Sequence, residues 1–251
     1  MIQRLPLHLT LAGMVSAVGC KEADKVADKA AAKDPAATSV TTTDKADRTT
    51  DEPKMKMKMT PKPTTAATLG TLPEGLGVAV GQPAPDATVL TFEGKPTQLS
   101  EVFAGRPTLL VFYRGGWCPF CNSQIHQLTE AHAEFDKRGV SLAAISVDRA
   151  EESAKTKARY TIPFPVLADP DLAAHEAFRV THEAPDEELE RLAGFGMDLE
   201  AASGRTHHTI AVPSMFLVDQ AGVVRWAHAD PDYKVRPSTE QLLAAIDGVG
   251  L

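Results

Sequence analysis

The stretch FYRGGWCPFCNSQIHQL, residues 112–128, holds two of the three cysteines in the 251-residue chain, Cys118 and Cys121. It continues the apolar run TLLVFY of residues 108–113, which has the length of a buried strand. Beyond Cys118 the pattern becomes helical. The residues that recur at three-to-four spacing are Ile125, Leu128, His132 and Phe135. The cysteine pair is therefore expected where a buried strand ends and a helix begins.

Strand and helix patterns alternate along the rest of the chain. Strands are predicted over residues 140–147, 164–167, 214–218 and 223–228, the last two as a hairpin. Helices are predicted over residues 148–159, 171–178 and 187–192, and after Ser238. Asp148 with Glu151, and Ser238 with Gln241, have the spacing of capping boxes. This order predicts an α/β fold with a central mixed β-sheet and helices on both faces.

The first twenty residues have the pattern of a secretory signal. Arg4 precedes an apolar stretch, Leu9–Val18, that is too short to span a bilayer. The segment ends in Ala-Val-Gly-Cys and resembles a bacterial lipobox, in which the cysteine, here Cys20, is acylated and becomes the mature N-terminus. This resemblance implies a lipid-anchored protein of the bacterial cell envelope that faces the periplasm. The alternative is an ordinary cleaved signal followed by an unmodified cysteine.

Residues 21–68 have the composition of a disordered tether. They contain no aromatic residue, no Leu and no Ile, so they cannot bury enough apolar area to offset the entropy of ordering. Within them, Met55–Met59 alternates with lysine and has thioethers suited to copper(I), but the lysines repel a cation, and a solvated linker is the simpler interpretation. All aromatic residues fall in the remaining part, which we expect to be one domain, residues 69–251.

The charge of the predicted domain limits the classes of molecule that it is expected to bind. Residues 69–251 contain fifteen basic and twenty-five acidic residues, which argues against nucleic acid as a partner. If Cys20 carries lipid, Cys118 and Cys121 are the only remaining thiols. A disulfide between them would close a loop too short to stabilise the fold appreciably, so a structural disulfide is not expected.

The position of the cysteine pair favours redox chemistry. A helix N-terminus stabilises a thiolate, which attacks disulfides or peroxides, and a second thiol within reach resolves the product. Arg114 is expected to add positive potential or to face solvent, and Trp117 to cover the site or to pack in the core. Zinc would need a second pair of ligands; His207 and His208 are adjacent, but they precede a predicted strand, whose neighbouring side chains point to opposite faces. No cofactor is expected.

FYRGGWCPFCNSQIHQL resembles the active-site segment of peroxiredoxin-like proteins of the AhpC/TSA group, in the thioredoxin-fold superfamily. The resemblance extends from GQPAPD, residues 81–86, through VPSMFLVDQAGVVRWAH, residues 212–228, to the last helix. It implies a thioredoxin-like fold, in which Pro213 occupies the place of the cis-proline that faces the cysteine pair. Pro119 lies between the two cysteines and belongs to the expected site.

The departure from the family pattern concerns the first cysteine. Typical peroxiredoxins carry a threonine three residues before the peroxidatic cysteine and an arginine later in the chain. Here Cys121 falls at the peroxidatic position and Cys118 at the position of the threonine. Arg225 and Arg236 are candidates for the partner arginine.

Three hypotheses follow. The first is a thiol–disulfide oxidoreductase, in which Cys118 is the more exposed attacking thiolate and Cys121 resolves. The second is a thiol peroxidase with Cys121 peroxidatic and Cys118 resolving. The third is a copper-binding thioredoxin-like module that uses both thiols. The expected partners are a protein disulfide or a hydroperoxide, a thiol reductant of the envelope, and the membrane through the lipid anchor.

Overall fold

The computed structural model describes residues 59–251. The signal segment with Cys20, the tether up to residue 58 and most of the methionine–lysine run lie outside the described residues. Among the helices of residues 59–251, none combines the length and the apolar character needed to cross a bilayer.

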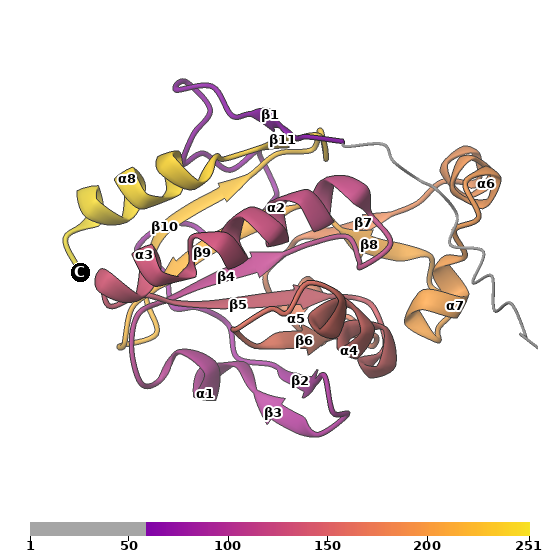
Figure 1. Ribbon diagram of the computed structural model, residues 1–251, viewed down its shortest axis with the longest axis horizontal. Coiled ribbons are helices and arrows are strands. Elements are labelled where there is room, and N and C mark those ends of the chain that lie inside the picture. The colour runs from indigo at the N-terminus through magenta and orange to yellow at the C-terminus, as the bar shows by residue number, and fades with distance from the viewer. Residues whose placement is uncertain (1–58) are drawn as a thin grey trace, which may run out of the picture. The chain divides into compact units, whose positions relative to one another are not determined.

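A seven-stranded mixed sheet forms the centre of the domain (Figure 1). Its spatial order is β10-β9-β4-β5-β6-β2-β3, in which β4, β5 and β6 are parallel and the other pairs antiparallel. The strands are β2 (Thr88–Thr91), β3 (Pro96–Gln98), β4 (Thr108–Phe112), β5 (Ser141–Ser146), β6 (Val166–Ala168), β9 (Ser214–Val218) and β10 (Val224–Ala229). Two small sheets pair β1 (Lys62–Pro63) with β11 (Val235–Arg236), and β7 (Thr181–Glu183) with β8 (Thr209–Ala211).

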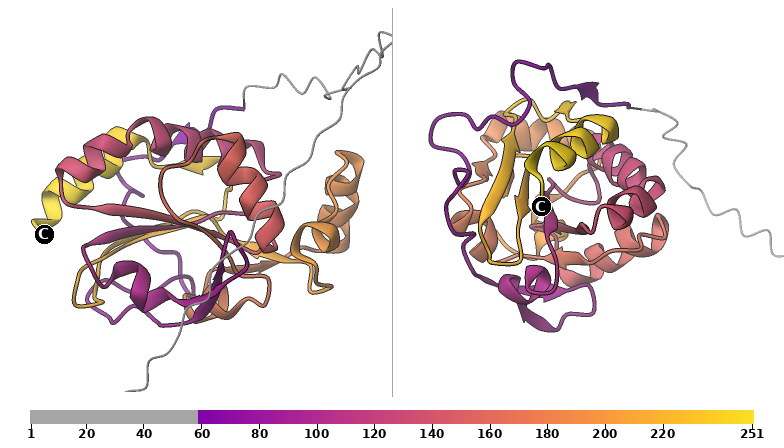
Figure 2. Two further views of the ribbon diagram at one scale, coloured as in Figure 1. Left: turned by 60° about the horizontal axis from the view of Figure 1, so that its bottom comes forward. Right: turned by 90° about the vertical axis from the view of Figure 1, so that its left-hand side faces the viewer.

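Helices cover both faces of the central sheet, as the sequence predicts (Figures 1 and 2). They are α1 (Leu99–Phe103), α2 (Pro119–Glu130), α3 (His132–Lys137), α4 (Ala150–Arg159), α5 (Ala173–Ala177), α6 (Asp186–Gly194), α7 (Leu199–Ser203) and α8 (Thr239–Val249). The core residues of α2, α3 and α8 pack on one face, and those of α1 and α5 on the other. The α/β class and the mixed sheet are therefore confirmed.

The central strands are buried on both faces, so they are apolar throughout rather than alternating. In β4, Leu109 and Val111 join the core under α2 and α8, while Leu110 and Phe112 join the core on the opposite face. A strand buried on both sides must sit in the middle of the sheet, and β4 lies between β5 and β9. This fixes the end of β4, and with it the cysteine pair, at the centre of one edge of the sheet.

The predicted boundary between tether and domain at residue 68 is wrong. Lys62–Pro63 pairs in parallel with β11, and Thr64 is buried. Composition suggested disorder because the segment carries no aromatic, Leu or Ile side chain. Backbone hydrogen bonds to β11 order it instead, and these do not depend on side-chain hydrophobicity.

Three other expectations differ from the structure in detail. The helix after Cys118 is divided at Ala131 into α2 and α3. The N-cap of α4 is Arg149, and Asp148 does not cap this helix. The segment of residues 180–208, expected as a loop with one short helix, contains β7, α6 and α7, which Figure 1 shows at one end of the domain. The capping box of Ser238 and Gln241 on α8 is confirmed.

Candidate active site

The cysteine pair occupies the first turn of α2. Cys118 is the N-cap residue in extended conformation, Pro119 follows at the first helical position, and Cys121 is the third residue of the helix. Proline is favoured at the first position, because its φ is already helical and its missing N–H would have no partner there. Both sulfurs therefore lie at the positive end of the helix dipole. Both cysteines are free thiols and both are buried, 1% and 0% exposed.

The two glycines before Trp117 let the loop fold tightly against its surroundings. Gly115 has a φ of +152°, and a Cβ there would collide with the indole Nε1 of Trp117. A Cβ on Gly116 would collide with Oγ1 of Thr156 on α4. The amide of Asn122 closes the loop by donating to the carbonyl of Gly116, at 2.7 Å. The loop that carries Cys118 is thus held between α2 and α4.

Arg236 is the charged group nearest to Cys121. Its Nη2 donates to the Cys121 Sγ at 3.5 Å, and its side chain is buried. Within residues 59–251, no carboxylate lies within ion-pair distance of this guanidinium, and its Nε has no hydrogen-bond acceptor. A buried cation without an anion is costly. The Cys121 thiolate is the group best placed to compensate it.

Arg114 is also buried beside the pair, but its charge is compensated. Its Nη2 forms an ion pair with Glu188 of α6 at 2.7 Å, and the guanidinium lies over the ring of Tyr233 at 4.2 Å. Glu188 contacts a second partner, Nε2 of His182, at 2.7 Å. The predicted choice for Arg114 between a site residue and a solvent-facing charge is thereby resolved: it is buried against Trp117, at 5.2 Å from the ring centre.

The surroundings push the pKa values of the two thiols apart. Burial raises the pKa of Cys121, but the hydrogen bond from Cys118 and the charges of Arg236 and Arg114 outweigh it and lower this pKa to about 5. The pKa of Cys118 is raised well above its usual value, first by the hydrogen bond with Cys121 and then by burial. The thiol that we expected to attack is thus the one that keeps its proton.

Asp148 is a site residue that the sequence reasoning missed. Its Oδ2 accepts from the N–H of Gly116 at 2.7 Å and from the Ser146 hydroxyl at 3.1 Å, while Oδ1 is buried without a partner. Burial raises the pKa of Asp148 to about 7, against hydrogen bonds that lower it. Asp148 follows β5, and the carboxyl ends of parallel strands meet at one edge of a sheet. Its place after a buried strand was the signal that could have identified it.

The Tyr113 hydroxyl belongs to the same buried group. It has no hydrogen-bond partner, and burial together with the nearby Asp148 carboxyl raises the pKa of Tyr113. A cavity of about 370 Å³ lies against the loop and is lined by Trp117, Asp148 and residues of α4 and α7. Trp117 is half-buried between this cavity and Arg114. Trp117 thus lies beside the cysteine loop and also packs against the hydrophobic core.

The remaining predicted residues separate into near and distant ones. Pro213 is buried directly before β9, and the pairing of Phe112 with Ser214 sets it level with Tyr113, at the edge where the cysteines lie. Arg225 is not near the pair: it binds Asp219 at 2.5 Å in the hairpin between β9 and β10. Of the two candidate arginines, Arg236 is the one beside Cys121.

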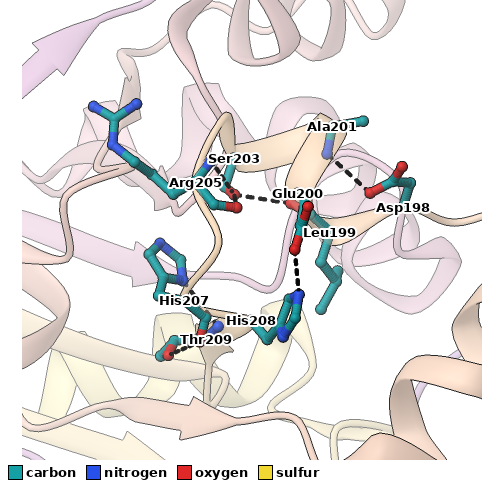
Figure 3. Close-up of polar contacts among 9 residues, drawn as sticks. All are labelled: Asp198, Leu199, Glu200, Ala201, Ser203, Arg205, His207, His208 and Thr209. Carbon is teal, nitrogen blue, oxygen red and sulfur yellow. Dashed lines mark hydrogen bonds and ion pairs between the residues drawn. The ribbon is translucent and has the colours of Figure 1, made fainter.

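The adjacent histidines do not form a ligand pair. Figure 3 shows His208 directed at the carboxylate of Glu200, at 2.8 Å, while His207 turns another way and its Nδ1 accepts from the N–H of Thr209 at 2.9 Å. The positive φ of His208, 50°, helps to separate the two rings. In the part of the chain that the structure describes, no group of three or more His, Cys, Asp or Glu side chains could hold a metal ion.

The AhpC/TSA family profile matches residues 80–227, more than half of the chain. The chain belongs to the AhpC/TSA family. Similar solved structures include the peroxidoxin BcpB of Mycobacterium tuberculosis (18% identical, TM-score 0.53) and reduced Prx3 of Vibrio vulnificus in complex with hydrogen peroxide (20% identical, TM-score 0.56). The matches cover 70% and 67% of this chain and 99% of each of those chains. They show that the fold is that of these thioredoxin-fold proteins.

Curated relatives match a shorter part of the sequence. A peroxiredoxin of Thermoplasma volcanium is 30% identical over 155 residues, which are 59% of this chain and 64% of that protein. The thiol-disulfide oxidoreductase ResA of Geobacillus kaustophilus is 31% identical over 97 residues, 38% of this chain and 55% of that protein. The chain thus spans less than two thirds of the length of these relatives.

Replacing Arg236 tests the electrostatics of the pair. In a Cys20→Ser background, Arg236→Met should raise the lowest thiol pKa by roughly 1–3 units, because the uncompensated charge beside Cys121 is removed. Arg236→Lys should retain most of the effect, and Arg225→Met should have none. The measurement is the pH dependence of thiolate ultraviolet absorbance. An unchanged titration in Arg236→Met would show that another group stabilises the thiolate.

The raised pKa of Asp148 predicts that the stability of the folded protein depends on pH. Its pKa is raised in the folded protein, so its contribution is fully present below the unfolded pKa and is lost as the pH rises toward 7. Between the two pKa values this one group lowers the free energy of unfolding by about 1.4 kcal/mol per pH unit. The free energy of unfolding should be measured in urea for the wild type and for Asp148→Asn. As the pH rises through this range, the wild type should lose stability relative to the variant. A difference that does not change with pH would contradict the raised pKa.

Proposed function

We propose that the protein is a thiol peroxidase in which Cys121 is the peroxidatic cysteine and Cys118 resolves. The main support for this proposal is the buried Arg236, whose Nη2 lies 3.5 Å from the Cys121 sulfur. This guanidinium has no carboxylate partner among residues 59–251. The lowered pKa of Cys121 and the raised pKa of Cys118 support the same assignment. This is the second of the three hypotheses from the sequence, with the roles of the cysteines reversed relative to the first.

The proposed cycle has three balanced steps. The Cys121 thiolate attacks the distal oxygen of a hydroperoxide, the O–O bond breaks, and with one proton taken up the products are Cys121 sulfenic acid and an alcohol or water. The Cys118 thiol then attacks the Cys121 sulfur, forming a disulfide and releasing water. Two equivalents of an external thiol finally reduce the disulfide and are themselves oxidised to a disulfide.

The burial of the pair favours a small oxidant over a protein disulfide. Attack on a disulfide brings two sulfurs into contact along the axis of the bond that breaks. Cys121 has no exposed surface and Cys118 only 1%, so a protein substrate would require the loop around Trp117 to open. The cavity of about 370 Å³ beside that loop is lined by Trp117 but by neither cysteine. A hydroperoxide must therefore also pass the loop, but its small size requires a smaller opening than a protein disulfide does.

Variants of the two cysteines distinguish this proposal from disulfide exchange. In a Cys20→Ser background, Cys118→Ser should still consume one equivalent of hydrogen peroxide and form a sulfenic acid on Cys121, but should not turn over. Cys121→Ser should lose the reaction by at least about a thousandfold. The measurement is peroxide consumption, with mass spectrometry of the dimedone-trapped sulfenic acid.

The opposite pattern would support a thiol–disulfide oxidoreductase, the activity in the name of the ResA relative. In that case a protein disulfide reacts faster than peroxide, and Cys118→Ser abolishes the reaction while Cys121→Ser leaves a trapped mixed disulfide on Cys118. This outcome would overturn our assignment of the two roles.

We also propose that the enzyme works in the bacterial envelope, anchored by lipid on Cys20 and reduced by a thiol donor of that compartment. The support is the sequence of residues 1–20, with Arg4, a short apolar stretch and a terminal cysteine. The full-length chain, expressed in a bacterium fed a labelled fatty acid, should take up the label, and Cys20→Ser should not. An unlabelled wild type, or a mature N-terminus at another residue, would refute the anchor.

A further inference from the structure

The end of the N-terminal segment contacts the strand that carries Arg236. We call residues 62–64 the arm; Figure 1 shows its strand β1 beside β11. The N–H of Lys62 donates to the carbonyl of Lys234 at 2.8 Å, and the N–H of Thr64 donates to the carbonyl of Arg236 at 2.9 Å. The arm is therefore attached at one end to Arg236 of β11 and at the other to Lys234, the residue before this strand.

Thr64 also ties the arm to α8. Its carbonyl accepts from Nε2 of Gln241 at 2.7 Å, and Gln241 belongs to the capping box that begins this helix. Thr64 is 3% exposed, whereas Lys62 and Pro63 are exposed. Both backbone polar groups of Thr64 are thus hydrogen-bonded: its N–H donates to Arg236, and its carbonyl accepts from Gln241 of α8.

Besides the arm, β11 is held by a short-range backbone hydrogen bond, from the N–H of Val235 to the carbonyl of Asp232 at 2.8 Å. It consists of two residues, and β1 is its only partner strand in the described sheets. The Arg236 side chain is not fixed by a carboxylate either: Nη1 reaches only the carbonyl of the preceding Val235, at 3.3 Å, and Nε has no acceptor. The position of the guanidinium beside Cys121 therefore depends on the position of the Arg236 backbone, which Thr64 holds.

We propose that the arm is a functional part of the active site and that Thr64 is a positioning residue for Arg236. By holding β11, it keeps the guanidinium at 3.5 Å from the Cys121 sulfur. Because the attraction between the two charges falls with distance, loss of the arm weakens the stabilisation of the thiolate while the central sheet stays intact. The role rests on the proposed function of Cys121, but its test measures ionisation and needs no peroxide.

Thr64→Pro is the decisive variant. It removes the N–H that donates to Arg236, and with it the hydroxyl that lies 3.4 Å from Nε2 of the buried His228. In the full-length chain with Cys20→Ser, the lowest thiol pKa should rise by at least about one unit, a tenfold change in the ionisation equilibrium. Thr64→Val loses the hydroxyl but keeps the N–H, so it should titrate as the wild type does. The same is expected of Thr65→Pro, which changes the adjacent, exposed residue.

A second comparison separates positioning from a general loss of structure. In an Arg236→Met background, Thr64→Pro should have no further effect on the titration, because the group through which it acts is gone. An equal shift in both backgrounds would overturn the proposal. If Thr64→Pro does not fold, Lys62→Pro removes the outer hydrogen bond of the arm instead and should shift the pKa in the same direction; an unshifted titration would then refute the role of the arm.

These results stay distinct from those for the proposed function. If the protein fails to reduce peroxide but its thiolate titration responds to Thr64→Pro through Arg236, the proposed role of the arm stands and the proposed peroxidase activity is refuted. If Thr64→Pro reduces peroxide at the wild-type rate and its thiols titrate as in the wild type, the proposed peroxidase activity stands and the role of the arm is refuted.

Discussion

The contact between Arg236 and Cys121 is the interaction on which the rest of the site depends. A buried guanidinium without a carboxylate needs another anion, and the sulfur at 3.5 Å supplies it when ionised. The first turn of α2 holds the same sulfur at the positive end of the helix dipole. The fold brings these two contributions together from opposite parts of the chain: β4 delivers the cysteine at the centre of the sheet edge, and β11 delivers the arginine.

The second buried arginine shows why only one thiolate is stabilised. Arg114 lies 5.2 Å from the ring centre of Trp117 in the active-site loop, but Glu188 compensates its charge at 2.7 Å and Tyr233 covers its face. Two uncompensated arginines would favour ionisation of both thiols, and the repulsion between two adjacent thiolates would oppose it. With one free charge, the pair shares a single proton, which Cys118 retains.

Patterns of neighbouring residues predicted the strands and helices that such residues form. They did not predict contacts between residues far apart in the sequence. The junction of strand and helix at Cys118 followed from apolar periodicity, since β4 and α2 are formed by neighbouring residues. Arg236 lies 115 residues from Cys121, and the sequence offered Arg225 equally. The spacing of Asp148 and Glu151 matches a cap, yet burial turns the carboxylate toward Gly116. In the arm, hydrogen bonds that any sequence can make overcame a composition typical of disorder.

The raised pKa of Cys118 sets the order of the proposed cycle. Its largest cause is the hydrogen bond with Cys121, which exists because Cys121 is anionic. Oxidation to the sulfenic acid removes that anion. The charge of Arg236 then has no thiolate to compensate it, which favours ionisation of Cys118 at this stage. The proton that Cys118 gives up is the one that the departing hydroxide needs to leave as water. In the proposed cycle Cys118 therefore keeps its proton until the oxidant has reacted with Cys121.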